Sequence, residues 1–181
     1  MGRPPTIDRD RVLDLAEGLL LKDGTGALTI DAVAKAAGIS KGGVQSRFGT
    51  KDALISAMLE RWSREYDAML AAAAGPTPTP IEAVRGHVAL SMEIDAEQEA
   101  RAAGMLAALI EAKHHLADVR TWYTEKFGGL DLQSESGRRA RLALLATEGA
   151  FMLRTFGFML FDDEEWTTLR DDLHALLGGT L

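Results

Sequence analysis

The amino-acid sequence predicts an all-α protein, with three helices at the N-terminus, a long connecting helix and then a helical bundle. Apolar residues recur at helical spacing through most of the 181 residues. Serine, threonine or aspartate precedes many of these stretches, and glycine or proline follows several of them, as is usual at helix ends. No segment shows the apolar–polar alternation of a β-strand, so we expect no sheet.

The first predicted helix covers residues 8–23. Val12, Leu13 and Ala16 begin its apolar stripe, which Leu19 and Leu20 continue at helical spacing. Gly24 follows and is placed to end the helix.

Two short helices joined by a tight turn are predicted next. Thr29 can cap the first, over residues 30–37, and Gly38 stands where the turn needs a positive φ. Ser40 can cap the second, which places Val44 and Phe48 four residues apart on its buried side.

The second short helix leaves polar, cationic and small residues facing outward, namely Lys41, Gly42, Gln45, Ser46 and Arg47. A helix start that is exposed and nearly free of bulk suits the major groove of DNA, where base edges and phosphates need hydrogen-bond donors. The segment therefore predicts a helix-turn-helix DNA-binding domain. The alternative interpretation is a helical hairpin within an ordinary bundle.

A long helix is predicted over residues 51–74, with Thr50 as its cap. The alternating prolines of residues 75–80 cannot continue it and mark a boundary. Thr79 and Glu82 then form a capping box around Pro80, which restarts the helical pattern. A bundle is expected from the remaining predicted helices, which cover residues 80–94, 96–112, 115–128, 136–160 and 163–177.

Charge is divided unevenly along the chain. Residues 1–62 carry nine Lys/Arg against eight Asp/Glu, whereas residues 63–181 carry eleven against nineteen, which together give the net charge of −7. Acidic residues are thus concentrated away from the predicted DNA-binding part. The chain has no cysteine, no apolar run of the roughly 18 residues that a membrane span needs, and no cleavable signal pattern, so we expect a cytoplasmic protein without a membrane partner.

The segment from Ile7 to Trp62 resembles the DNA-binding domain of transcriptional repressors of the TetR (AcrR-type) family. The resemblance is carried by Ala16 to Leu20, Gly24, Leu28-Thr29, Val33-Ala34, Ala37 to Gly42, Phe48 and Lys51 to Leu54. Two positions depart from the family: Gln45 stands where a tyrosine is usual, and Ser46 where a histidine or an aromatic residue is frequent. A glutamine can form two hydrogen bonds with an adenine edge, so base reading remains open at Gln45.

The expected DNA contacts follow from the resemblance and from the outward face described above. We predict that bases lie near Lys41, Gly43, Gln45 and Ser46, and that phosphates are held by Thr29, Ser40, Arg47 and Lys51; Gly42 is a further candidate for DNA contact. Arg3, in the N-terminal arm, is a further candidate that can enter the minor groove.

The helix predicted over residues 136–160 is apolar on a broad face, made of Leu142, Leu145, Ala146, Gly149, Met152, Leu153, Phe156 and Leu160. The last helix offers Trp166, Leu169, Leu173, Leu176 and Leu177 at matching spacing. We predict a symmetric homodimer built from these two helices, as the resemblance also implies. Such a dimer would bind a pseudo-palindromic operator whose half-sites lie about one helical turn apart.

A small-molecule inducer bound within the C-terminal bundle is implied by the resemblance. Candidate ligand residues on inward stripes are His87, Ser91, Met105, Leu109, Trp122, Phe127, Glu148, Phe151 and Met152. Glu148 can meet a cationic ligand or pair with Arg141 on its own helix face. We accordingly divide the chain into an arm and helix-turn-helix domain (1–50), a connecting helix (51–74) and a ligand-binding and dimerisation domain (75–181).

No cofactor, metal or enzymatic activity is expected. Glu111 and His114 form one Glu-x-x-His unit, but di-iron bundles need two such units and further carboxylates. The leading hypothesis is a ligand-responsive repressor that its inducer releases from the operator. The alternatives are an activator with the same DNA reader, and an all-α interaction module or enzyme bundle that does not bind DNA.

Overall fold

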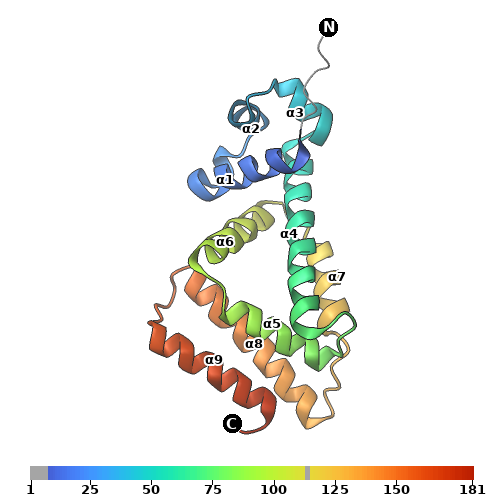
Figure 1. Cartoon of the computed structure of the whole chain (residues 1–181), viewed down its shortest axis with the longest axis vertical. Coiled ribbons are helices and arrows are strands. Elements are labelled where there is room, and N and C mark those ends of the chain that lie inside the picture. Colours follow the sequence, from blue (N-terminus) through green and yellow to red (C-terminus); the bar gives the residue numbers. More distant parts are fainter. Residues whose placement is uncertain (1–7, 113–114) are drawn as a thin grey trace. The chain divides into compact units, whose positions relative to one another are not determined.

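The computed structural model describes residues 8–112 and 115–181, and within them the chain is helical with no strand (Figure 1). This confirms the predicted all-α fold. The helices are α1 (Arg9–Ala27), α2 (Ile30–Ala37), α3 (Lys41–Phe48), α4 (Lys51–Ala74), α5 (Pro80–Met92), α6 (Ala96–Glu111), α7 (Leu116–Phe127), α8 (Glu135–Thr155) and α9 (Asp163–Gly178). None of these helices combines the length and the apolar character needed to cross a lipid bilayer.

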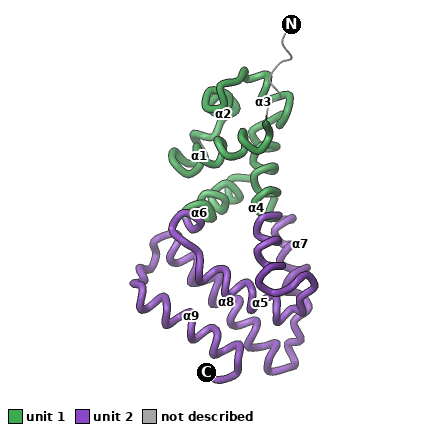
Figure 2. The backbone as a smooth tube through the Cα atoms, viewed as in Figure 1, with its two compact units in different colours: residues 1–63, 100–116 green, residues 64–99, 117–181 purple. Residues whose placement is uncertain are grey.

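The chain forms two compact units (Figure 2). The first contains residues 1–63 and 100–116, and the second contains residues 64–99 and 117–181. Helices α4 and α6 therefore each contribute residues to both units.

The first unit is held by an apolar core to which α1, α2, α3 and α4 all contribute. Its most deeply buried side chains include Leu13, Val33, Val44, Leu54 and Met58. The predicted stop at Gly24 is seen as a break in the helical geometry of α1 (φ 76°), after which one more turn follows to Ala27. Since burying such side chains is favourable by roughly 1.5–3 kcal/mol each, this core fixes the faces that the short helices leave exposed.

An ionic cluster lies beside this core. Glu17 is only 7% exposed, and its carboxylate accepts hydrogen bonds from Arg61 of α4 (2.6 Å) and from Nε of Arg101 of α6 (2.9 Å). Arg61 also contacts Asp14 at 2.7 Å. A buried carboxylate needs such partners, because its desolvation would otherwise cost several kcal/mol.

The second unit is built around α5, α8 and α9, which pack against one another and bury one apolar core. The core residues are Ala83, Val84, Val88, Met92, Phe127, Ala140, Ala143, Leu144, Leu173 and Leu177. The predicted capping box at the start of α5 is present, with the Thr79 hydroxyl accepting from the Glu82 amide and the Glu82 carboxylate accepting from the Thr79 amide.

One predicted boundary in this unit was wrong. Helix α8 ends at Thr155 and not at residue 160, because Gly157 adopts a left-handed conformation (φ 66°) that continues no α-helix. The apolar stripe of α9, which was assigned to the dimer interface, packs inside the same unit, so a dimer contact through α9 would use its other residues, and the homodimer itself stays a prediction. Leu173 and Leu177 are core residues there, and Trp166, Leu169 and Leu176 lie against them.

Candidate functional site

The first candidate site is the exposed side of α3, which local capping positions. The Ser40 hydroxyl accepts from the Gly43 amide at 3.1 Å, and the Thr29 hydroxyl accepts from the Ala32 amide at 3.1 Å, so both predicted caps are present. Gly38 turns the chain between the two helices with φ 66°. Val44 and Phe48 are buried, which directs the opposite side of α3 to solvent.

The polar side chains of α3 differ in whether other residues of the protein form hydrogen bonds or ion pairs with them. Lys41 forms an ion pair with Asp31 at 2.8 Å, and the Ser46 hydroxyl donates to the Gly43 carbonyl at 2.9 Å. Gln45 and Arg47 are exposed, and the described part of the chain gives neither side chain a polar partner. These two side chains are therefore the ones on α3 whose polar groups are fully available to a ligand.

Lys51 lies in the first turn of α4, as predicted, and its own unit partly engages it. Its Nζ donates to the Thr25 carbonyl at 2.8 Å and lies 4.0 Å from Glu111. The side chain remains 38% exposed, and an ammonium has three N–H groups, so it can still donate to a phosphate. Arg3 was also predicted to contact DNA, but it lies outside the described residues.

The second candidate site lies in the second unit, around His87. This side chain is 5% exposed, and its Nδ1 lies 2.5 Å from the Tyr66 hydroxyl. Its Nε2 lies 3.0 Å from Oε1 of Glu148, in close contact but without a well-aligned hydrogen bond. The Tyr123 hydroxyl donates to the same Oε1 at 2.6 Å. Glu148 thus contacts His87 and Tyr123, and not Arg141, the intrahelical partner considered from the sequence.

The environment of this cluster shifts the protonation of its members. Burial acts to raise the pKa of Glu148, but the contact and positive charge of His87 and the hydrogen bond from Tyr123 outweigh it and lower that pKa. Burial, together with the nearby charge of Glu148, raises the pKa of both Tyr66 and Tyr123. Both hydroxyls therefore keep their protons at neutral pH, and Glu148 is a carboxylate.

Aromatic rings surround the polar cluster. The Trp122 ring packs edge-on against Tyr66, Tyr123 and Phe127, with centroid distances of 5.1 to 5.7 Å. Its Nε1 donates to Asp67 at 2.8 Å. Asp67 is 40% exposed and also pairs with Lys126 at 3.0 Å, so Glu148 is the carboxylate that lies among these aromatic rings. A carboxylate beside aromatic faces is the chemistry that binds organic cations.

The structure gathers some of the predicted ligand residues and separates others. His87, Trp122, Phe127 and Glu148 belong to this cluster, and Ser91 adjoins it through a hydrogen bond with Tyr66. Phe151 is partly buried and Met152 is 45% exposed, while the buried Met105 and Leu109 belong to the first unit.

Tyr66, Asp67 and Tyr123 were missed from the sequence. Tyr66 and Tyr123 are the chain's two tyrosines, and both reach the His87–Glu148 pair. The presence of only two tyrosines was the available signal, but the fold is what brings Tyr66 of α4 to His87 and Tyr123 of α7 to Glu148.

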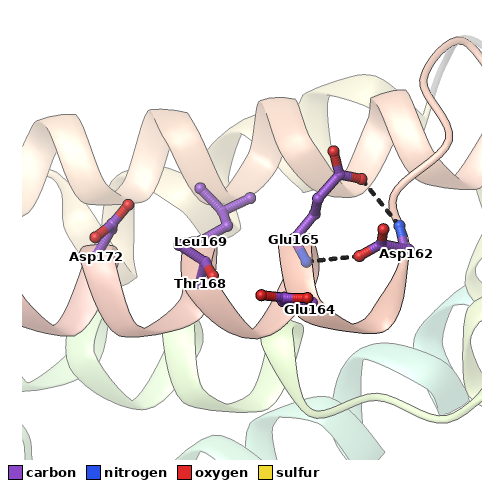
Figure 3. A pocket seen from close by; sticks show the side chains of 6 residues that line it. All are labelled: Asp162, Glu164, Glu165, Thr168, Leu169 and Asp172. Atoms are coloured by element: carbon purple, nitrogen blue, oxygen red, sulfur yellow. Dashed lines mark hydrogen bonds between the residues drawn. The ribbon is translucent and has the colours of Figure 1, made fainter.

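A shallow hollow of about 370 Å³ runs along α9 (Figure 3). It is lined by Asp162, Glu164, Glu165, Thr168, Leu169 and Asp172. Asp162 and Glu165 are already engaged with each other's backbone amides as a capping box. None of the predicted ligand residues lines it. Across residues 8–112 and 115–181, no three side chains of the metal-binding types cluster; His114 lies outside these ranges.

Comparison with known proteins places the chain in a family. The family model described as "Tetracyclin repressor-like, C-terminal domain" matches residues 81–178, which is more than half of the chain. The model described as "Bacterial regulatory proteins, tetR family" matches residues 12–58, which contain α2 and α3. A search of curated proteins finds no significant match.

Solved structures share the fold at low sequence identity. A transcriptional regulator from Rhodococcus sp. Rha1 is 21% identical, with a TM-score of 0.68 over 96% of this chain and 98% of that one. The fatty acid degradation regulator FadR from Bacillus halodurans is 16% identical, with a TM-score of 0.58 over 95% and 99% of the two chains. A TetR-family regulator from Haemophilus influenzae gives 16% identity and a TM-score of 0.56, over 91% and 93%.

The two family models together span both the helix-turn-helix and the C-terminal bundle. Proteins of this family are DNA-binding regulators and not enzymes. The chain belongs to the TetR family of transcriptional regulators.

Proposed function

We propose that the protein is a homodimeric repressor that a small molecule releases from its operator, acting in the cytoplasm. The observation that carries the proposal is the exposed side of α3, which is capped, nearly free of bulk, and bears Gln45 and Arg47 with unused polar groups. Such a helix can enter the major groove, with Lys41, Gly42, Gly43, Gln45 and Ser46 near bases. Thr29, Ser40, Arg47 and Lys51 would hold phosphates, and Arg3 would reach the minor groove.

Dimerisation is supported by the outer face of α8. Leu142 is 54% exposed, Leu145 is 61% exposed and Met152 is 45% exposed, while the opposite face of this helix is buried in its own unit. Exposed apolar side chains that share one helix face often mark a surface that contacts another protein. We propose that a second copy covers it through α8 and α9, which would present two copies of α3 to half-sites about one helical turn apart.

The proposed inducer site is the cluster around His87 and Glu148. The Glu148 carboxylate and the surrounding aromatic rings favour a cationic or aromatic ligand over an anionic one. A ligand shifts the protein away from DNA only if it binds the released conformation more tightly than the DNA-bound one. Helix α4 contributes residues to both units. We propose that a change in its tilt is how ligand binding in the second unit alters DNA binding by α3.

The test is a fluorescence anisotropy titration of the full chain against labelled genomic fragments at low and high salt. We expect one or a few fragments to bind far more tightly than the rest, with affinity that falls steeply as salt rises. Uniformly weak binding to every fragment would contradict the proposal. It would favour an all-α interaction module instead.

A further inference from the structure

Gly42 is a glycine that the protein itself does not require. It is exposed on the outward side of α3 and has no positive φ, unlike Gly38, where the turn demands glycine. A Cβ built on Gly42 would meet only the Ser40 hydroxyl, at an ordinary 4.0 Å. Glycine forms helices less well than alanine, so Gly42 lowers the stability of α3. No contact within the described residues requires a glycine at this position. A glycine at this position would instead serve a bound molecule that comes close to the α3 backbone.

Gln45 lies beside this bare position. It is three residues further along the helix, so its side chain neighbours Gly42 on the surface. The nearby polar groups are engaged, because Lys41 pairs with Asp31 and the Ser46 hydroxyl donates to the Gly43 carbonyl. The Gln45 amide has a carbonyl acceptor and an NH2 donor, and the described residues leave both unused.

These two residues complement one particular base edge. In the major groove adenine presents N7 as an acceptor and N6 as a donor, and a glutamine amide can bond both at once. Guanine offers two acceptors and no donor at the same positions, so it matches an arginine and not a glutamine. The side chain reaches the edge only if the helix backbone comes close to the groove floor, which a missing side chain at Gly42 allows.

We propose that Gly42 and Gln45 form an adenine-reading pair, in which Gly42 gives clearance for close approach and Gln45 bonds N6 and N7 of one adenine in each half-site. This inference rests on the proposed DNA-binding function. It assigns Gln45 to base reading and not to a phosphate contact.

The first test is selection from a pool of duplexes randomised over about three helical turns, with the full-length protein and its Gln45→Ala and Gln45→Arg variants. The unsubstituted protein should enrich an adenine at one position of each half-site. Replacing that adenine should weaken DNA binding by the unsubstituted protein by about 5- to 150-fold. The same replacement should hardly change the DNA affinity of the Gln45→Ala variant. Gln45→Arg should shift the preference at the same position to guanine.

The second test compares Gly42→Ala with Gly18→Ala. Gly18 is an exposed helical glycine of α1 that also has open space around its Cβ position, so it is a matched control. Both substitutions should raise the melting temperature, by about 1–4 °C. Only Gly42→Ala should weaken binding to the selected duplex, by about tenfold or more, because its methyl group holds the helix away from the bases.

Enrichment of no duplex at all would overturn both the proposed function and this inference. Enrichment of symmetric duplexes with no adenine that depends on Gln45, or an equal loss of affinity for all sequences in Gln45→Ala, would overturn the inference alone. Equal DNA affinity of Gly42→Ala and the unsubstituted protein would show that Gly42 is not needed for close approach to the bases.

Discussion

Nε of Arg101 lies 2.9 Å from Oε2 of Glu17, so that a guanidinium of α6 contacts a buried carboxylate of α1. The two residues come from segments matched by different family models, Glu17 by the N-terminal one and Arg101 by the C-terminal one. Both nevertheless lie in the first compact unit. Part of α6 is thus tied by charge to the same group of helices that holds α3.

The first prediction concerns the stability of this unit. Glu17→Gln removes the charge that Arg61 and Arg101 share and should lower the free energy of unfolding by about 3 kcal/mol. Arg61 would keep Asp14 as a partner, which limits the loss. Urea denaturation measures the effect, with Glu60→Gln, an exposed carboxylate of α4, as the control. A loss no larger in Glu17→Gln than in Glu60→Gln would show that the cluster adds nothing to stability.

The second prediction concerns acid stability. The pKa of Glu148 is lowered in the folded protein, so its contribution is fully present above the ordinary value of 4.5 and is lost as the pH falls through the lower folded value. Glu148→Gln should therefore show a flatter fall in melting temperature below about pH 4.5 than the unsubstituted protein. Parallel curves for the two proteins across the acid range would show that the contacts of Glu148 with His87 and Tyr123 do not stabilise its charged form.

The third prediction concerns dimerisation. Leu145→Glu places a carboxylate on the exposed face of α8 and should raise the dimer dissociation constant by about 100-fold or more, since the charge would be buried on association. Leu132→Glu, at an exposed leucine in the segment before α8, is the control and should remain dimeric. Sedimentation velocity distinguishes the two. If Leu145→Glu dimerises like the control, this face is not the interface.

The fourth prediction concerns Lys51. If its remaining N–H groups hold a phosphate, Lys51→Ala should weaken binding to all DNA sequences and reduce the salt dependence of affinity by about one unit. Anisotropy titrations over a range of salt concentrations measure both quantities. An unchanged affinity and salt slope would mean that Lys51 serves only the Thr25 carbonyl, with which it already forms a hydrogen bond.

Local signals predicted the first unit well. Thr29, Ser40 and Gly38 act through residues close to them in sequence, and each adopts the predicted role. The end of α8 was missed because the apolar residues after Gly157 continue the helical spacing, and spacing alone does not reveal that this glycine turns left-handed. At Gly24, by contrast, the sequence correctly predicted a glycine that breaks the helical geometry.

The second unit was harder to predict because its contacts join distant segments. The α9 stripe is equally apolar whether a second copy or its own bundle covers it, so periodicity could not decide between them. Glu148 was noticed for its apolar surroundings, but its partners His87 and Tyr123 come from α5 and α7. Only the packing of those helices makes them neighbours.

Dimethyl sulfate footprinting on a selected duplex reports on guanine N7 in the major groove and on adenine N3 in the minor groove, and so shows where two copies of α3 would bind. We expect two protected patches in the major groove, about one helical turn apart, with two protein copies in each complex. A single protected patch, a complex with one copy, or protection confined to the minor groove would contradict this expectation.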